Sequence, residues 1–189
     1  LLGQLAAAPP DMTTARQWFE AGRHADVSAI PLADGAPSSL AYLVAQSYDR
    51  LDQPASARAA REQLAARPST DPWRFIGQSG VLLAGGQVTQ ALAAAEQAVA
   101  LGPRLAEAQF QLGLVHAEQR NYAKAATAFE AAIAVDPLPA YAHYNAGLSY
   151  YRVQRIDLMA RYFESFLKLA PNAPERAQVE SIMRTVRGR

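Results

Sequence analysis

The chain has 189 residues, of which 50% are hydrophobic and 19% are charged, a balance typical of a folded globular protein with a substantial core. Its 18 lysine and arginine residues against 17 acidic ones leave a formal net charge of +1, so no basic field attracts nucleic acid or an anionic membrane. The sequence contains no cysteine, which excludes disulfides, thiolate metal sites and a cysteine nucleophile.

Residues 1–10 form an apolar N-terminal segment. The Ala-x-Ala pattern at Ala6 and Ala8 has two interpretations: the tail of an export or membrane-anchor segment, or a helical turn ended by Pro9 and Pro10. The sequence thus favours an exported or periplasmic location slightly over a cytoplasmic one. No stretch approaches the roughly 18 consecutive apolar residues that span a bilayer.

Residues 11–37 predict a short pair of helices. Asp11 is placed to cap the first helix and Gly22 to end it. The second helix starts near His24 and is cut short by Pro31. We interpret this segment as a degenerate N-terminal copy of the unit that follows it.

Four fuller helix-turn-helix units come next, and their closing prolines reveal the repeat. Pro103, Pro137 and Pro171 follow one another at a spacing of 34 residues, each at the end of an apolar-striped segment. Pro68 falls one residue early, so the first of these units is the least regular. The expected units are 38–71, 72–105, 106–139 and 140–173.

Small residues recur at fixed phases of these units. In the first helices Ser79, Gly113 and Gly147 share one phase, where a surface with little or no Cβ lets two helices approach closely. In the second helices, alanines keep the side-chain volume on the inward face small, and phenylalanines fill the space between units. These second-helix positions are Ala91, Ala125 and Met159; Ala95, Phe129 and Phe163; and Ala98, Ala132 and Phe166.

Residues 174–189 predict a capping helix that covers the last unit. Asn172 and Glu175 have the spacing of a capping box at its start. Its inward stripe is expected to be Val179, Ile182, Met183 and Val186.

The pattern of small and aromatic residues resembles the tetratricopeptide repeat (TPR) family. The match is best in residues 106–137, where Leu112-Gly113, Ala125, Phe129 and Pro137 are all in phase. The resemblance covers residues 38–173 firmly and most of the chain loosely. It implies an all-α fold, a right-handed α-solenoid of helix-turn-helix (tetratricopeptide-like) repeats with a C-terminal capping helix.

Catalytic and metal-binding motifs are not apparent in the sequence. His24, His116 and His143 have no partner at the spacing of metal ligands, and we expect them to pack in or near the core. The glycines at 85 and 86 lack the lysine and the preceding strand of a phosphate-binding loop. We therefore expect no enzyme activity, no metal and no cofactor.

The resemblance also implies a binding surface, because the first helices of this family line a concave groove. The Lys and Asn side chains by which some members hold a C-terminal carboxylate are absent, since Gln46, Gly80, Leu114 and Leu148 occupy one set of those places. An apolar or aromatic-bearing peptide or helix is the expected occupant instead, with Arg152 available to one acidic group. The expected groove residues are Trp73, Ile76, Phe110, Leu114, Tyr141, Tyr144, Leu148, Tyr151 and Arg152.

The function predicted from the sequence is a non-enzymatic scaffold for protein–protein interaction, with a protein or peptide partner and no role for nucleic acid. One alternative is a structural subunit of a larger assembly or a homo-oligomer. Another is the docking module of an enzyme whose catalytic domain lies outside this chain.

Overall fold

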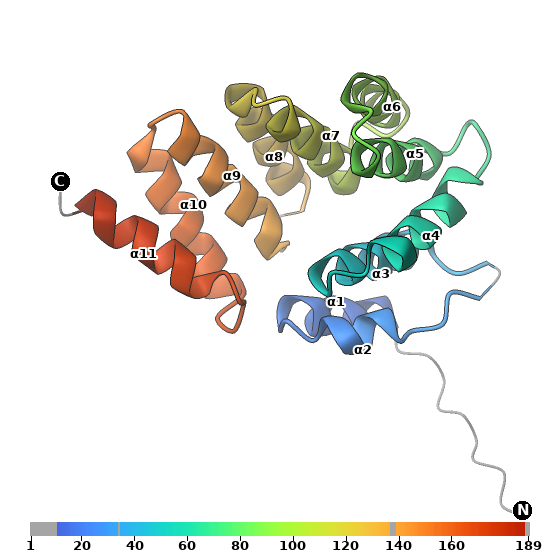
Figure 1. The fold of residues 1–189 in the computed structure, drawn as a ribbon, viewed down its shortest axis with the longest axis horizontal. Helices are drawn as coiled ribbons and strands as arrows, with labels where there is room; N and C mark the ends of the chain where they lie inside the picture. Colours follow the sequence, from blue (N-terminus) through green and yellow to red (C-terminus); the bar gives the residue numbers. More distant parts are fainter. Residues whose placement is uncertain (1–10, 34, 137–138, 188–189) are drawn as a thin grey trace, which may run out of the picture.

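A computed structural model describes residues 11–33, 35–136 and 139–187, and the apolar segment 1–10 lies outside these described residues. The described chain forms eleven helices and no strand, and successive helices pack side by side as an all-α solenoid (Figure 1). None of these helices is both long and apolar enough to cross a bilayer. The helices are α1 (Met12–Glu20), α2 (His24–Ser28), α3 (Ser38–Arg50), α4 (Pro54–Ala65), α5 (Pro72–Ala84), α6 (Val88–Leu101), α7 (Ala106–Glu118), α8 (Tyr122–Val135), α9 (Ala140–Arg152), α10 (Ile156–Leu169) and α11 (Arg176–Arg187).

The N-terminal pair begins and ends where the sequence indicates. The Asp11 carboxylate accepts a hydrogen bond of 2.8 Å from the Thr14 amide and so caps α1. Gly22 follows the end of this helix with a φ of +74°. The second helix, α2, ends at Ser28, before Pro31. The prediction of a short helix pair here is confirmed.

The turn inside each helix pair is built in the same way throughout. The amide three residues beyond the end of the first helix bonds the carbonyl five residues back, which satisfies an otherwise unpaired carbonyl of the last helical turn. The residue before this amide has a left-handed backbone. The five bonds run from the amides of Arg23, Gln53, Gln87, Asn121 and Arg155 to the carbonyls of Trp18, Tyr48, Leu82, His116 and Tyr150.

The second helices supply the core that the repeat phase predicts. All nine positions named above on α6, α8 and α10 are buried, with at most 2% of any of them exposed. Phe129, Phe163 and Phe166 are fully buried. Alanine on the inward face therefore brings the helices together, and the phenylalanines fill the remaining space.

The small residues of the first helices lie at close helix contacts, as predicted. A Cβ on Gly113 would lie 2.6 Å from Cε1 of Phe129, and a Cβ on Gly147 would lie 2.5 Å from Cδ1 of Phe163. Ser79 occupies the same phase in α5, where it is buried and donates a 2.9 Å hydrogen bond to the Ala91 carbonyl.

The last helix, α11, packs on α10 and caps the solenoid with Val179 and Met183 buried. Ile182 and Val186 are partly buried beside them. The predicted capping box at its start is wrong, because the helix begins only at Arg176. The Glu175 carboxylate bonds Arg50 and Tyr141 instead, so it is not available to the α11 amides.

Candidate functional site

The predicted groove residues divide into a buried set and a more exposed set. Ile76, Phe110, Tyr141 and Tyr144 are each no more than 9% exposed. The others lie nearer to solvent along the first helices α5, α7 and α9. Trp73, Leu114 and Leu148 are half-buried, and Tyr151 and Arg152 are exposed.

The buried set has partners inside the solenoid. The ring of Phe110 lies 5.4 Å from that of Phe129, and the ring of Tyr144 lies 5.1 Å from that of Phe166. Tyr141 is covered by α1, because the Phe19 ring meets it edge-on at 5.5 Å. These side chains join the first helices to their neighbours.

Two adjoining hollows lie between the first helices of successive pairs and the second helix α4. One, of about 240 Å³, is lined from α3, α4, α7 and α9, and the other, of about 410 Å³, from α3, α4, α5 and α7. They share Asp49, Arg61, Gln111 and Leu114. The structure thus has a continuous groove, which we call the central groove, with Leu114 at its middle.

Arg61 enters the central groove because Gly80 leaves room for it. A Cβ on Gly80 would lie 2.7 Å from Cδ of Arg61, so the arginine stem lies over this part of α5. Its guanidinium forms an ion pair with Asp49. The equivalent positions of the other units hold Gln46, Leu114 and Leu148, and the arginine stem fills the space that such a side chain would take.

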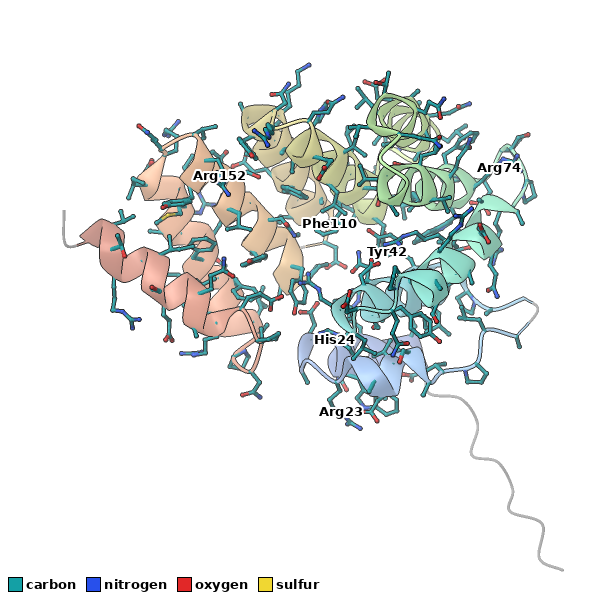
Figure 2. All side chains as sticks on the ribbon, viewed as in Figure 1. Arg23, His24, Tyr42, Arg74, Phe110 and Arg152 are labelled. Carbon is teal, nitrogen blue, oxygen red and sulfur yellow. The ribbon has the colours of Figure 1, made fainter. Side chains whose placement is uncertain are left out.

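A smaller cavity of about 60 Å³ lies where α1 meets α3 and α7. Three carboxylates, those of Glu20, Glu107 and Asp136, line it together with Arg16. Burial is the main cause that raises the pKa of Glu20 to about 7 and that of Glu107 above its ordinary value. Tyr42 and Phe110 line the same cavity. Figure 2 shows these two residues toward the middle of the molecule, apart from Arg152 at the end of α9.

The three histidines are buried in the solenoid. The His24 ring meets the Phe19 ring at 4.9 Å, His116 Nδ1 lies 3.3 Å from Gln119 Oε1, and the His143 ring lies 6.0 Å from that of Tyr162. Within the described ranges, no group of three or more histidine and acidic side chains is arranged to hold a metal ion.

The sequence interpretation missed the side chains that connect distant units. Arg16 pairs with Asp136, Glu20 bonds the Ala140 amide, and Arg50 pairs with Glu175. Each pair is 120 or more residues apart in the chain, so no local spacing indicates it. The sequence indicates the contact of Arg61 with Gly80 only weakly, through a glycine at a position where the other units have a larger residue.

The sequence comparison finds one family. The profile described as "Tetratricopeptide repeat" matches residues 81–128 and, overlapping them, residues 111–174. Comparison with curated proteins gives no match.

Solved structures share the fold. TTC0263, a thermophilic TPR protein of Thermus thermophilus, has a TM-score of 0.65 and 20% identity, over 89% of this chain and 95% of that one. A MamA RS-1 double mutant gives a TM-score of 0.60 and 22% identity over 82% and 87%.

A third structure is the first TPR of Spaghetti (RPAP3), solved bound to the HSP90 peptide SRMEEVD. It gives a TM-score of 0.57 and 15% identity over 65% of this chain and 97% of that one. At these identities the likeness concerns the fold. The family profile, the 34-residue period and the stacked helix pairs together establish that the chain belongs to the tetratricopeptide repeat family.

Proposed function

We propose that this chain is a non-enzymatic scaffold that binds a peptide or helix of a partner protein in the central groove. The observation that carries the proposal is the pair of adjoining hollows that meet at Leu114, lined by first helices of four successive pairs. A solved TPR domain with a similar fold is bound to a peptide, which supports the use of such a surface for peptides.

The partner segment that fits this groove is mainly apolar. Leu83, Phe110 and Leu114 line the groove with apolar surface. The half-buried Leu148 and the exposed Tyr151 lie further along α9, outside the lining of the two hollows. Arg61 and Arg50, the basic groups within the groove, are already paired with Asp49 and Glu175. Binding therefore rests on burial of apolar and aromatic area, and the exposed Arg152 at the end of α9 is able to meet one acidic side chain of the partner.

The test uses the partner captured from the native cell and compares two matched variants. Leu114→Asp places a charge in the groove, whereas Leu101→Asp places the same charge at an exposed leucine near the end of the second helix α6. We expect Leu114→Asp to weaken binding at least tenfold and Leu101→Asp to leave it unchanged, with equal helical content in both. Affinity is also expected to change little between low and moderate salt, because few exposed ion pairs would be screened.

If both variants lose binding equally, or if neither loses it, the binding surface lies outside the central groove. A steep fall in affinity with added salt would contradict an apolar mode of binding.

A further inference from the structure

Helix α1 meets the start of α9, near the other end of the solenoid (Figure 1). Arg16 Nη1 lies 2.7 Å from Asp136 Oδ2, in an ion pair that is half-buried. Both oxygens of Glu20 lie 3.3 Å from the Ala140 amide. This amide belongs to the first residue of α9, and Pro139 before it has no side-chain acceptor, so Glu20 caps α9 from another part of the chain.

A second set of side chains closes the same gap. The Arg50 guanidinium lies 3.8 Å from the centre of the Tyr141 ring and 2.5 Å from a Glu175 oxygen. The Tyr141 hydroxyl donates to the other Glu175 oxygen at 3.1 Å. Helix α3, which packs on α1 and α2, is thereby joined to α9 and to the residue that precedes α11.

Contacts of this kind are not needed for a solenoid to fold, because each repeat of such a protein is stabilised by its own core and by its immediate neighbours. A link between the first and last pairs restrains the curvature of the whole array. The link combines polar contacts with an apolar one, because the buried cluster that contains Phe19 also contains Tyr141 and Phe166.

The closing contact also includes polar groups that make few or no hydrogen bonds. Both ring nitrogens of His24 are buried and have no hydrogen-bond partner among the described residues. The Glu20 carboxylate is partly buried with two long hydrogen bonds to a single amide. Burying polar groups with incomplete hydrogen bonding offsets part of the gain from the ion pair and the aromatic contact.

We propose that the contact of α1 with Asp136, Ala140 and Tyr141 is a clasp that holds the solenoid closed and can open without loss of the helix pairs. While the clasp is shut, α1 covers Tyr141 and narrows the concave face. When it opens, the array relaxes, and the Phe19 and Tyr141 rings become accessible. The clasp is a property of this chain alone and does not rest on the partner proposed above.

Because the chain has no cysteine, closure can be measured with two introduced ones. Ala21 and Asn172 are both exposed, and a Cβ on the neighbouring Gly22 would lie 3.7 Å from the Asn172 carbonyl oxygen. In the full chain, Ala21→Cys with Asn172→Cys is expected to cross-link rapidly with a short bis-maleimide. Adding Arg16→Glu is expected to slow the reaction at least fivefold and to increase the radius of gyration in small-angle scattering, at unchanged helical content.

Two further variants make the test specific. Adding Asp136→Arg to Arg16→Glu restores an ion pair of reversed polarity and is expected to recover the fast cross-linking. Arg58→Glu removes an exposed ion pair with Glu62 inside α4 and is expected to change nothing. The clasp is overturned if Arg16→Glu cross-links as fast as the parent, or if the reversed pair does not recover fast cross-linking. Loss of helical content on breaking the ion pair would also overturn it. None of these outcomes affects the proposed central groove.

Discussion

Four residues spaced 34 apart, at 52, 86, 120 and 154, have a left-handed backbone in the turns of the helix pairs. Their φ angles are +54°, +72°, +58° and +60°, and only the second is glycine. An L side chain in this conformation costs roughly 1 to 2 kcal/mol, because its Cβ lies too near the following carbonyl oxygen. Asp52, Arg120 and Gln154 are therefore strained, and the hydrogen bond that closes each turn keeps them in place.

Replacing Arg120 by glycine is expected to stabilise the protein. The variant removes the strain, while the greater freedom of glycine in the unfolded chain offsets about 0.4 to 1 kcal/mol of this gain. We expect a net increase of about 0.5 kcal/mol in the free energy of unfolding, measured by urea denaturation. The opposite change, Gly86→Ala, is expected to lower it by about 1 kcal/mol.

The control is Lys124→Gly on the exposed side of α8, where a helical backbone makes glycine unfavourable by about 1 kcal/mol. If Arg120→Gly destabilises as much as Lys124→Gly does, the left-handed turn residue is not strained.

At the scale of helices, the pairing of glycine with phenylalanine sets how closely the two helices of a pair approach. Gly113 faces Phe129 between α7 and α8, and Gly147 faces Phe163 between α9 and α10. In the pair α5–α6 the corresponding residues are Ser79 and Ala95, so a larger residue on one helix is matched by a smaller one on the other. This complementarity keeps the pairs similar in spacing although their sequences differ.

Gly113→Ala is expected to destabilise the protein by about 1 to 3 kcal/mol, because the new methyl group would overlap a fully buried ring. Glycine to alanine normally stabilises a helix by about 0.8 to 1 kcal/mol, so the sign of the effect is diagnostic. Thermal or urea denaturation measures it.

A double-mutant cycle with Phe129→Leu isolates this contact. The smaller side chain is expected to make Gly113→Ala less harmful than it is beside phenylalanine. A stabilising Gly113→Ala, or strictly additive effects, would contradict the assigned helix contact.

For the whole molecule, closure of the solenoid makes stability depend on pH through Glu20. Burial is the largest cause that raises its pKa to about 7, and Asp136 adds to it. The Ala140 amide, Arg16 and Arg50 oppose the shift. The folded protein thus holds this proton more tightly than the unfolded chain, whose carboxyl has its ordinary pKa of 4.5.

Glu20 therefore stabilises the folded protein most below pH 4.5, and this contribution is lost as pH rises from 4.5 to about 7. Glu20→Gln, which cannot ionise, is expected to flatten the pH dependence of the urea midpoint over this range and to exceed the parent in stability above pH 7. Glu96→Gln, on the exposed surface of α6, controls for the loss of one negative charge.

His24 contributes with the opposite sign. Burial first, and Arg50 second, lower its pKa below 6.5, while Glu175 opposes this, so the stability associated with neutral His24 is lost as pH falls below 6.5. The comparison of Glu20→Gln with the parent at each pH cancels this contribution, provided that His24 is unchanged. Parallel pH profiles for the two proteins would show that Glu20 has no raised pKa.

The sequence by itself determined the repeat. A period of 34 residues with small and aromatic side chains in phase is local information, because each unit packs mainly on its immediate neighbours. The helix pairs, the buried second-helix positions and the glycine contacts were therefore predictable. The burial of Ile76, Phe110, Tyr141 and Tyr144 was not, because the repeat phase places a residue on a face but does not say what covers it.

Only the tertiary structure decided how the two ends of the array meet. The distance between Glu20 and Ala140 depends on small rotations accumulated over every helix between them, and no motif in the sequence encodes their sum. The same holds for Arg50 and Glu175. The central groove shares this origin, since its width follows from the curvature of the complete solenoid rather than from any one unit.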